Sequence, residues 1–364
     1  MIYNWQHKEW ANFIYDSEVI KEIATIFFEK ASEIDSILSG LNTAEQQEEL
    51  IRFMLSEAAK TSEIEGEFIS RQDLMSSIKN RLGLNANPET VKDKRAVSVS
   101  NLVVAVRNSY SEKLTETEIK QWHKLLFENS KTIRAGKWRT SAEPMQVISG
   151  AAGREIVHYE APPSYRVSAE MKQFVKWYNS FKINEKSDVL TKTAISHLYF
   201  ESVHPFEDGN GRVGRAIAEK CLAQSLGKPV LLSLSSVIEK NKKQYYAELK
   251  NAQNTLVITD WIIYFSNVVK QAQIEAIEIV QFSIKKTRFF DRFKNELNDR
   301  QQKAINKMFD AGAEGFTGGM TAKKYISINK TSKSTATRDL QHLAEIEAFR
   351  PQGEGRNVHY LLNI

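Results

Sequence analysis

The chain has 364 residues, which is more than one ordinary domain needs and enough for two or three domains with cores of their own. Its 50 Lys and Arg against 45 Asp and Glu give a net charge of +5, so composition permits contact with nucleic acid or nucleotides without requiring it. With 41% hydrophobic residues and only 7 Pro and 16 Gly, the composition excludes a largely disordered chain and favours a folded, helix-rich protein.

A single cysteine, Cys221, excludes an internal disulfide and a cysteine-rich zinc site, and its apolar neighbours Val213 and Ile217 predict a buried packing role. The N-terminus lacks the basic start and apolar run of a signal peptide. No segment offers the ~20 apolar residues that a membrane span needs. These features predict a cytoplasmic protein without membrane contact.

Residues 1–90 are predicted to form an N-terminal helical segment. Aromatic residues between positions 5 and 15 precede a helical pattern over about 18–38, and a small core or a docking face is their expected use. Thr43 and Gln46 have the spacing of a capping box, so a second helix is expected to start there and to run to about Gly66.

Residues 91–290 are predicted to form a helical core that carries one β-hairpin. The segments 145–148 and 155–159 flank a turn of small residues at 149–153, and Pro162-Pro163 ends the second strand. Helical periodicity covers most of the remaining core.

Residues 291–364 are predicted to form a separate domain. Three short helical patterns, near 299–309, 321–325 and 334–346, lead into an extended pair around 353–355. That order of elements is typical of a winged helix-turn-helix. The predicted fold is therefore mainly α, with a winged helix-turn-helix domain at the C-terminus.

The residues with the most chemical meaning begin at His204. His204-Pro205 is expected to end a helix opened by Asp188, because the residue before a proline avoids the helical conformation. Gly209-Asn210-Gly211 then supplies a turn with exposed amides that leads into a helix ending at Gly227. A glycine turn that feeds a helix N-terminus is suited to bind an anion.

Two arginines and a carboxylate define the expected ligand more closely. Arg212 and Arg215 lie in the first helical turn, where the dipole disfavours cations unless an anion is near, and more than one phosphate would fit there. Asp208 would repel phosphate, and a bridging Mg²⁺ resolves this conflict. Together with His204 as a base, these residues predict phosphoryl or nucleotidyl transfer.

The segment from His204 to Arg215 resembles the signature of the Fic family, His-x-Phe-x-(Asp/Glu)-Gly-Asn-Gly-Arg-x-x-Arg, at every fixed position. The resemblance implies a protein adenylyltransferase. In it, His204 takes the proton from a Tyr, Thr or Ser hydroxyl of a target protein, itself included, and the hydroxyl oxygen attacks the α-phosphorus of ATP. It implies Asp208 as the ligand of Mg²⁺. The nucleotide-binding residues that it implies are Phe206, Gly209, Asn210, Gly211, Arg212 and Arg215.

A second motif lies upstream, where Thr61-Ser62-Glu63-Ile64-Glu65-Gly66 resembles the family's inhibitory motif (Ser/Thr)-x-x-x-Glu-(Gly/Asn). The matching positions are Thr61, Glu65 and Gly66. Glu65 is expected at a helix C-terminus, where the dipole disfavours a carboxylate. The resemblance implies that Glu65 pairs with Arg215, takes the place of the γ-phosphate and leaves the free protein nearly inactive. The hairpin at 145–160 is similar to the family's flap, whose edge pairs with an extended target segment.

Two alternatives stay open. The same site would also serve removal of AMP or the use of another nucleotide. A DNA-binding regulator is a different class of protein, in which residues 332–339 open a recognition helix. The basic residues that would contact DNA are Lys323, Lys324, Lys330, Lys333 and Arg338. The sequence leaves the target protein and the oligomeric state open, a homodimer included.

Overall fold

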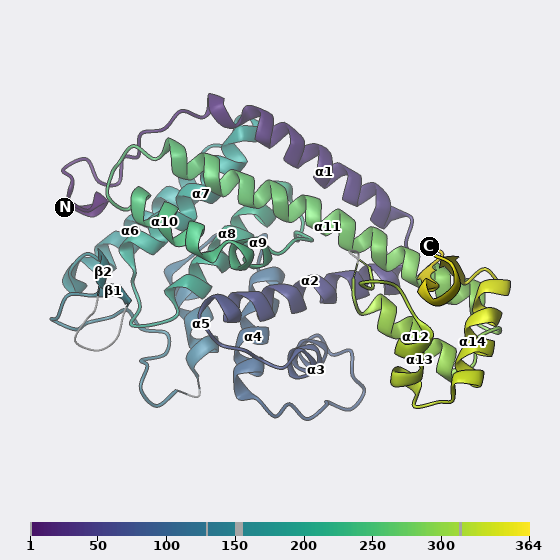
Figure 1. Cartoon of the computed structure of the whole chain (residues 1–364). Coiled ribbons are helices and arrows are strands. Elements are labelled where there is room, and N and C mark those ends of the chain that lie inside the picture. The colour runs from purple at the N-terminus through teal and green to yellow at the C-terminus, as the bar shows by residue number, and fades with distance from the viewer. Residues whose placement is uncertain (1, 129, 150–155, 313–314) are drawn as a thin grey trace. The chain divides into compact units, whose positions relative to one another are not determined.

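The computed structural model describes residues 2–128, 130–149, 156–312 and 315–364. The chain divides into two compact units, Met1–Ala276 and Ile277–Ile364. Helices dominate both units, as predicted, and the two sheets found among the described residues are antiparallel pairs (Figure 1). Within the same residues, no helix combines the length and apolar character needed to cross a bilayer.

The first unit consists of helices around one β-hairpin, after short 3-10 turns at Asn4–Gln6 and Glu18–Ile20. Its helices are α1 (Lys21–Ser39), α2 (Thr43–Ile64), α3 (Arg71–Arg81), α4 (Lys94–Asn108), α5 (Glu116–Phe127), α6 (Ser164–Ser180), α7 (Lys186–Val203), α8 (Asn210–Leu226), α9 (Leu234–Lys240), α10 (Lys242–Ala252) and the first part of α11 (Thr259–Phe293). Its strands are β1 (Gln146–Ser149) and β2 (Ile156–Glu160).

Helix α7 lies at the centre of this unit, beside α8 (Figure 1). Every residue from Val189 to Val203 is buried, so α7 is enclosed on all sides rather than amphipathic. The N-terminal aromatics join this core, since Trp10 and Phe13 pack edge-on against Tyr199 at centroid distances of 5.1 and 5.8 Å. A residue displayed at the end of α7 therefore stands on a rigid, packed element.

The capping residues of two helices differ from the prediction. At α2 the N-cap is Asn42, whose side chain accepts from the backbone N–H of Glu45 at 3.1 Å, while Glu45 accepts from the N–H of Asn42 at 2.8 Å. Asparagine is the stronger N-cap, and it precedes the predicted pair of Thr43 and Gln46 by one residue. At α7 the N-cap is Glu185, not Asp188, which lies in the first turn.

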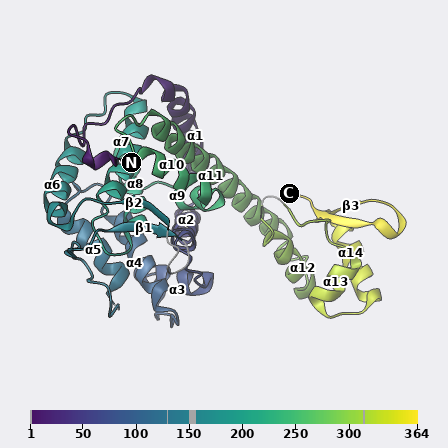
Figure 2. The same cartoon turned by 60° about the vertical axis from the view of Figure 1, so that its left-hand side comes forward.

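The predicted β-hairpin is present as β1 paired antiparallel with β2, with Gln146 opposite Glu160 and Ser149 opposite Ile156 (Figure 2). Of the turn predicted at 149–153, Ser149 belongs to β1 instead, and residues 150–153 lie outside the described residues. The two strand ends nearest the core, Gln146 and Glu160, are also joined by a side-chain hydrogen bond of 2.9 Å.

The second unit contains the end of α11, then α12 (Asp299–Phe309), α13 (Ala322–Asn329) and α14 (Lys333–Glu345), followed by strands β3 (Phe349–Gln352) and β4 (His359–Leu362). Met320 forms an isolated bridge to Tyr360 in β4, which adds a third extended segment. The order of helices and strands is the one predicted for a winged helix-turn-helix (Figure 2). The boundaries at 90 and 290 stay predictions, because α11 runs without interruption through the second of them.

Candidate active site

His204 follows directly after the last residue of α7 and has a left-handed backbone, with φ 47° and ψ 61°. Its N–H still donates to the carbonyl of Phe200 at 3.0 Å, and Pro205 prevents the helix from continuing. Arg139 holds this strained corner: its Nε donates to the carbonyl of His204 at 2.7 Å, and its backbone N–H donates to that of Pro205 at 2.9 Å. Because Arg139 is 2% exposed, the clamp is shielded from water.

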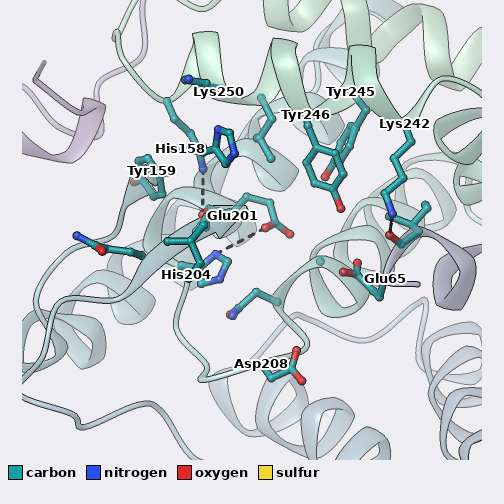
Figure 3. Close-up of a pocket in the computed structure, with 18 of the residues that line it drawn as sticks. Glu65, His158, Tyr159, Glu201, His204, Asp208, Lys242, Tyr245, Tyr246 and Lys250 are labelled. Carbon is teal, nitrogen blue, oxygen red and sulfur yellow. Dashed lines mark hydrogen bonds and ion pairs between the residues drawn. The ribbon is translucent and has the colours of Figure 1, made fainter. Parts of the chain in front are cut away.

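The imidazole of His204 is held in its neutral form. Burial and, to a smaller extent, the positive charge of Arg139 together lower the pKa of His204 to about 4. Nδ1 lies 3.9 Å from Oε2 of Glu201, a buried carboxyl group whose pKa is raised to about 8 by burial (Figure 3). Nδ1 is turned toward Glu201, so proton transfer from a substrate to Nε2 requires the tautomer that carries its hydrogen on Nδ1.

The loop after His204 is fixed by residues beneath it. Phe206 is fully buried and stacks on His123 with ring centroids 3.8 Å apart. The side chain of Asn210 accepts from the N–H of Phe206 and donates to its carbonyl, both at 2.9 Å. His123 Nδ1 accepts from the N–H of Gly136, so Nε2–H is left to donate to the carbonyl of Asp208 at 3.1 Å. The expected nucleotide ligands Phe206 and Asn210 thus have side chains engaged in shaping the loop.

Two glycines give the loop the space for an anion. Gly209 is the N-cap of α8 with φ 78°, and a Cβ there would lie 2.5 Å from Cε2 of Phe127. A Cβ on Gly211 would lie 2.5 Å from Oε1 of Glu65. The carboxylate of Asp208 accepts from the N–H of Gly209 at 2.6 Å, and Asp208 is exposed to solvent.

Replacing Gly209 by alanine is expected to destabilise the fold more than the same change at Gly227. Both glycines have a left-handed backbone, which costs a non-glycine residue about 1–2 kcal/mol, but only at Gly209 does the added methyl group collide with a neighbour. Overpacking adds roughly 1–3 kcal/mol. The free energy of unfolding, measured with urea for both variants, tests this. Equal losses at the two positions would contradict the close contact with Phe127.

Arg215, in the first turns of α8, is almost fully enclosed by the end of α2. Its Nη2 donates to Oε1 of Glu65 at 2.7 Å and to the carbonyl of Thr61 at 3.0 Å, and its Nε donates to Oγ1 of Thr61 at 2.9 Å. Burial alone would raise the pKa of Glu65, but the attraction of Arg215, with Arg212 and Lys242, lowers it. Glu65 is therefore an anion in the neutral pH range, and Gly66 ends α2 beside it with φ 80°.

Arg212 has a carboxylate partner as well, from the same segment after α2. Its Nη1 lies 3.3 Å from both oxygens of Glu67, and its guanidinium lies 5.2 Å above the ring of Phe127. Glu65 and Glu67 together neutralise both arginines of the signature. Neither Arg212 nor Phe206 lines the main cavity, whereas Arg215 does.

One cavity of about 840 Å³ brings most of the predicted residues together (Figure 3). This volume is within the range of small-molecule sites. Glu65 closes one side, while His204 and Asp208 lie along the wall formed by the end of α7 and the loop after it (Figure 3). The β-hairpin and α10 complete the lining. Their lining residues include Gln146, Val147, His158, Tyr159, Lys242, Lys243, Tyr245, Tyr246 and Lys250.

Sequence reasoning missed Glu201 and the α10 residues that line the cavity, and it missed several residues that act by holding others in place. His123 and Arg139 support the loop, Glu201 faces the base, and Glu67 holds Arg212. Arg139 belongs to a Gly-Lys-Trp-Arg stretch that is similar to a family feature, but the other three lie in ordinary helical or loop sequence with no local signal.

Residues 113–222 match the Fic/DOC family, and this segment contains the whole signature from His204 to Arg215. These residues of the chain therefore form a Fic domain. Outside the Fic domain, residues 3–84 match a domain of unknown function, DUF4172, which contains α2 and Glu65. The candidate site therefore combines elements of two separately matched regions with α10, which lies outside both.

Relatives of the Fic domain include named enzymes. The chain is 34% identical to a probable protein adenylyltransferase of Aquifex aeolicus over 101 residues, a stretch that covers 28% of each chain. Over 132 residues it is 30% identical to a protein adenylyltransferase of Caenorhabditis elegans, covering 36% of this chain and 23% of that one. The likeness thus spans well under half of either relative.

Two solved structures share the fold of this Fic-domain protein. A Fic family protein from Desulfovibrio desulfuricans superposes with a TM-score of 0.52 at 18% identity, over 93% of this chain and 95% of that one. A Fic domain containing signaling protein from Bacteroides thetaiotaomicron superposes with a TM-score of 0.53 at 18% identity, over 71% of this chain and 96% of that one. The predicted helical Fic fold is confirmed.

Proposed function

We propose that this Fic-domain protein transfers AMP from ATP to a hydroxyl group of a protein. One observation carries the proposal: a neutral histidine, an exposed carboxylate and a glycine-lined helix N-terminus with a buried arginine all line the same cavity. The names of the relatives support the same chemistry. A Tyr, Thr or Ser hydroxyl of the target, or of this chain itself, would be the acceptor.

The chemistry follows from the order of groups along the wall. Nε2 of His204 takes the hydroxyl proton, the freed oxygen bonds to the α-phosphorus, and pyrophosphate leaves. The backbone amides at Gly209 and Gly211 and the positive end of α8 stabilise the phosphate charge, together with Arg215. Because His204 is held by Arg139 and its loop by His123, the base needs no rearrangement before the reaction.

Asp208 fits the role of a Mg²⁺ ligand. Its carboxylate is exposed beside the anion cradle, and Mg²⁺ in such sites is held by one or two carboxylates and by substrate phosphates. Among the described residues no group of three or more His, Cys, Asp or Glu could hold a metal, so the ion would come with the nucleotide. The metal would neutralise phosphate charge.

Exchanging Asp208 for asparagine should lower AMP transfer at 1 mM Mg²⁺ by about 10- to 100-fold, as the loss of a metal-site group does. Higher Mg²⁺ should restore part of the rate, because the amide oxygen is a weaker ligand in the same place. Titrating the rate with Mg²⁺ measures this for both proteins, with Glu207→Gln as the matched control on the neighbouring carboxylate. An identical Mg²⁺ dependence for wild type and D208N would exclude the role.

The free protein is proposed to be inhibited by its own α2. The carboxylate of Glu65 lies against Gly211 and on Arg215, which is where a phosphate of the nucleotide would bind. Glu67 occupies Arg212 in the same way. Both arginines are thus neutralised by carboxylates, and ATP must displace at least Glu65 to place its γ-phosphate there.

Labelled ATP tests the proposed function directly. Wild type, Glu65→Gly and His204→Ala proteins are incubated with Mg²⁺ and ATP labelled on the α-phosphate in a cell lysate, and the labelled protein bands are compared. The proposal requires label on protein with Glu65→Gly and none with His204→Ala. Loss of label from AMP-modified protein would instead indicate AMP removal, and label only with another nucleotide would indicate a different donor.

A further inference from the structure

The second unit carries the protein's entire excess of positive charge. Residues 277–364 contain 15 Lys and Arg against 10 Asp and Glu, whereas residues 1–276 contain 35 of each. The Fic domain lies wholly in the balanced part. A polyanionic partner would therefore be attracted to the second unit rather than to the site of AMP transfer.

Helices α13 and α14 form a helix-turn-helix within this unit. α13 ends at Asn329, Lys330 turns the chain with a left-handed backbone at φ 50°, and α14 begins at Lys333. Ser332 caps α14, because its Oγ accepts from the N–H of Thr335 at 3.2 Å. A turn of this length between two helices is the arrangement that places the second helix in a DNA groove.

The two sides of α14 are sharply different. The inward side consists of Ala336, Leu340 and Leu343, with Asp339. The exposed side carries hydrogen-bond donors at helical spacing and no apolar side chain. Ahead of Glu345, the last residue of the helix, its exposed residues are Lys333, Ser334, Thr337, Arg338 and Gln341. We refer to these five residues as the α14 face.

Within α14, all of which the structure describes, the exposed negative charge is at Glu345, the last residue of the helix and beyond the α14 face. Asp339 is the one acidic residue between positions 321 and 344, all of which the structure describes, and it is 4% exposed. Its carboxylate accepts from Nε of Arg300 at 2.8 Å and from the hydroxyl of Tyr325 at 3.0 Å. Up to position 344, the surface of the helix-turn-helix therefore shows no exposed carboxylate, and Glu345 follows at its C-terminal end.

The other basic residues divide into two groups. Lys323 and Lys330 are exposed, and so is Arg350 in β3, whose neighbour Phe349 is buried in the core of the unit. Lys324 was among the residues expected at DNA, but its Nζ donates to the carbonyls of Thr317 and Gly319 at 2.6 and 2.8 Å. It is therefore engaged in holding the loop before α13.

We infer that the second unit binds double-stranded DNA, with the α14 face in the major groove. The major groove of B-DNA admits an α-helix, whereas that of duplex RNA is too narrow and deep. A protein partner is disfavoured because interface cores are built from aromatic and apolar side chains, and the α14 face has none. Lys333 and Arg338 supply phosphate or base contacts, and Lys323 and Lys330 extend the positive surface.

The test measures binding of the full-length protein to a fluorescent 25-base-pair DNA duplex of random sequence. Anisotropy is recorded between 50 and 200 mM salt for wild type, for Lys333→Ala with Arg338→Ala, and for Lys303→Ala with Lys307→Ala. The last pair removes the same charge from exposed positions of α12 in the same unit. Each lost phosphate contact lowers the salt slope by about 1. Between 50 and 200 mM salt, the affinity of the α14 variant should therefore fall roughly tenfold less than that of the wild type. The α12 variant should show a salt dependence close to that of the wild type.

Three results would overturn the inference. The first is that the wild type does not bind the DNA duplex at 50 mM salt. The second is that the α12 variant loses as much affinity as the α14 variant, because binding would then depend on the overall charge of the unit and not on the α14 face. The third is preferential binding of a duplex RNA of the same length. Because all four residues are exposed, the melting temperatures of the variants should equal that of the wild type. If the α14 variant melts at a lower temperature, the binding measurement is repeated with Lys333→Gln and Arg338→Gln, which keep the aliphatic part of each side chain.

Discussion

Replacing His204 by alanine should reduce AMP transfer by about 10²- to 10⁴-fold, the range that a general base contributes. The affinity for ATP should stay within a few-fold of the wild type, because the base acts on the acceptor hydroxyl and the phosphates are held by α8. Single-turnover transfer with labelled ATP measures the first quantity, and calorimetric titration with ATP measures the second. Transfer near the wild-type rate would remove His204 from the mechanism.

The pH dependence of the same reaction tests the state of the imidazole. The pKa of His204 is lowered to about 4 by burial and by Arg139, and only the neutral ring accepts a proton. Activity should therefore be lost as the pH falls through about 4, rather than through the ordinary histidine value near 6.5. The profile of kcat/KM reports on the free enzyme and is the one to compare. An acid limb near 6.5 would show that the ring is more solvated than the structure has it.

Local sequence patterns predicted the parts of this fold that local physics controls. His204-Pro205 ends α7, Gly227 ends α8 with a left-handed backbone, and α12 covers the predicted residues 299–309. Each of these features depends on a residue's own backbone preference or on helical periodicity. The N-caps of α2 and α7 were missed by one and three residues, because neighbouring polar residues compete for the same N–H groups.

The candidate site could be predicted only as far as its motifs extend. The ion pair between Glu65 and Arg215 was expected from two motifs and is present at 2.7 Å. The contacts of Arg139 with His204, and of Glu67 with Arg212, join positions 65 and 145 residues apart. The stretch around Arg139 is similar to a family feature, but nothing in the local sequence identifies the partner of Arg139 or of Glu67, since both pairings arise only when distant segments pack together. The missed residues thus share one cause: their function depends on tertiary contacts with a motif.

Replacing Glu65 by glycine should raise the rate of AMP transfer by about 5- to 150-fold, the range typical of coupling between two sites. Glu65 caps the C-terminus of α2, where the dipole disfavours its charge, and an ion pair of 2.7 Å with Arg215 in the second turn of α8 stabilises it. Glycine removes the carboxylate that occupies the phosphate position. The affinity for ADP should change little, because ADP lacks the γ-phosphate that Glu65 displaces.

A set of four further variants separates inhibition from binding. Glu63→Gln is the matched control, since Glu63 lies one half-turn earlier and pairs with Lys60 at 2.6 Å instead of facing the cavity. It should leave the rate unchanged. Arg215→Ala also breaks the inhibitory pair, but it deletes a contact that productive ATP needs, so this variant and its combination with Glu65→Gly should both stay inactive.

Glu67→Gln completes the set, because it frees Arg212 while Glu65 still occupies Arg215. It should activate less than Glu65→Gly does, since Arg212 does not line the cavity whereas Arg215 does. Transfer rates of all variants are compared at saturating ATP and one fixed Mg²⁺ concentration. A Glu65→Gly protein as slow as the wild type would exclude inhibition by α2. An active double variant would show that Arg215 serves only to hold Glu65, and phosphate binding would then rest on the amides of Gly209 and Gly211.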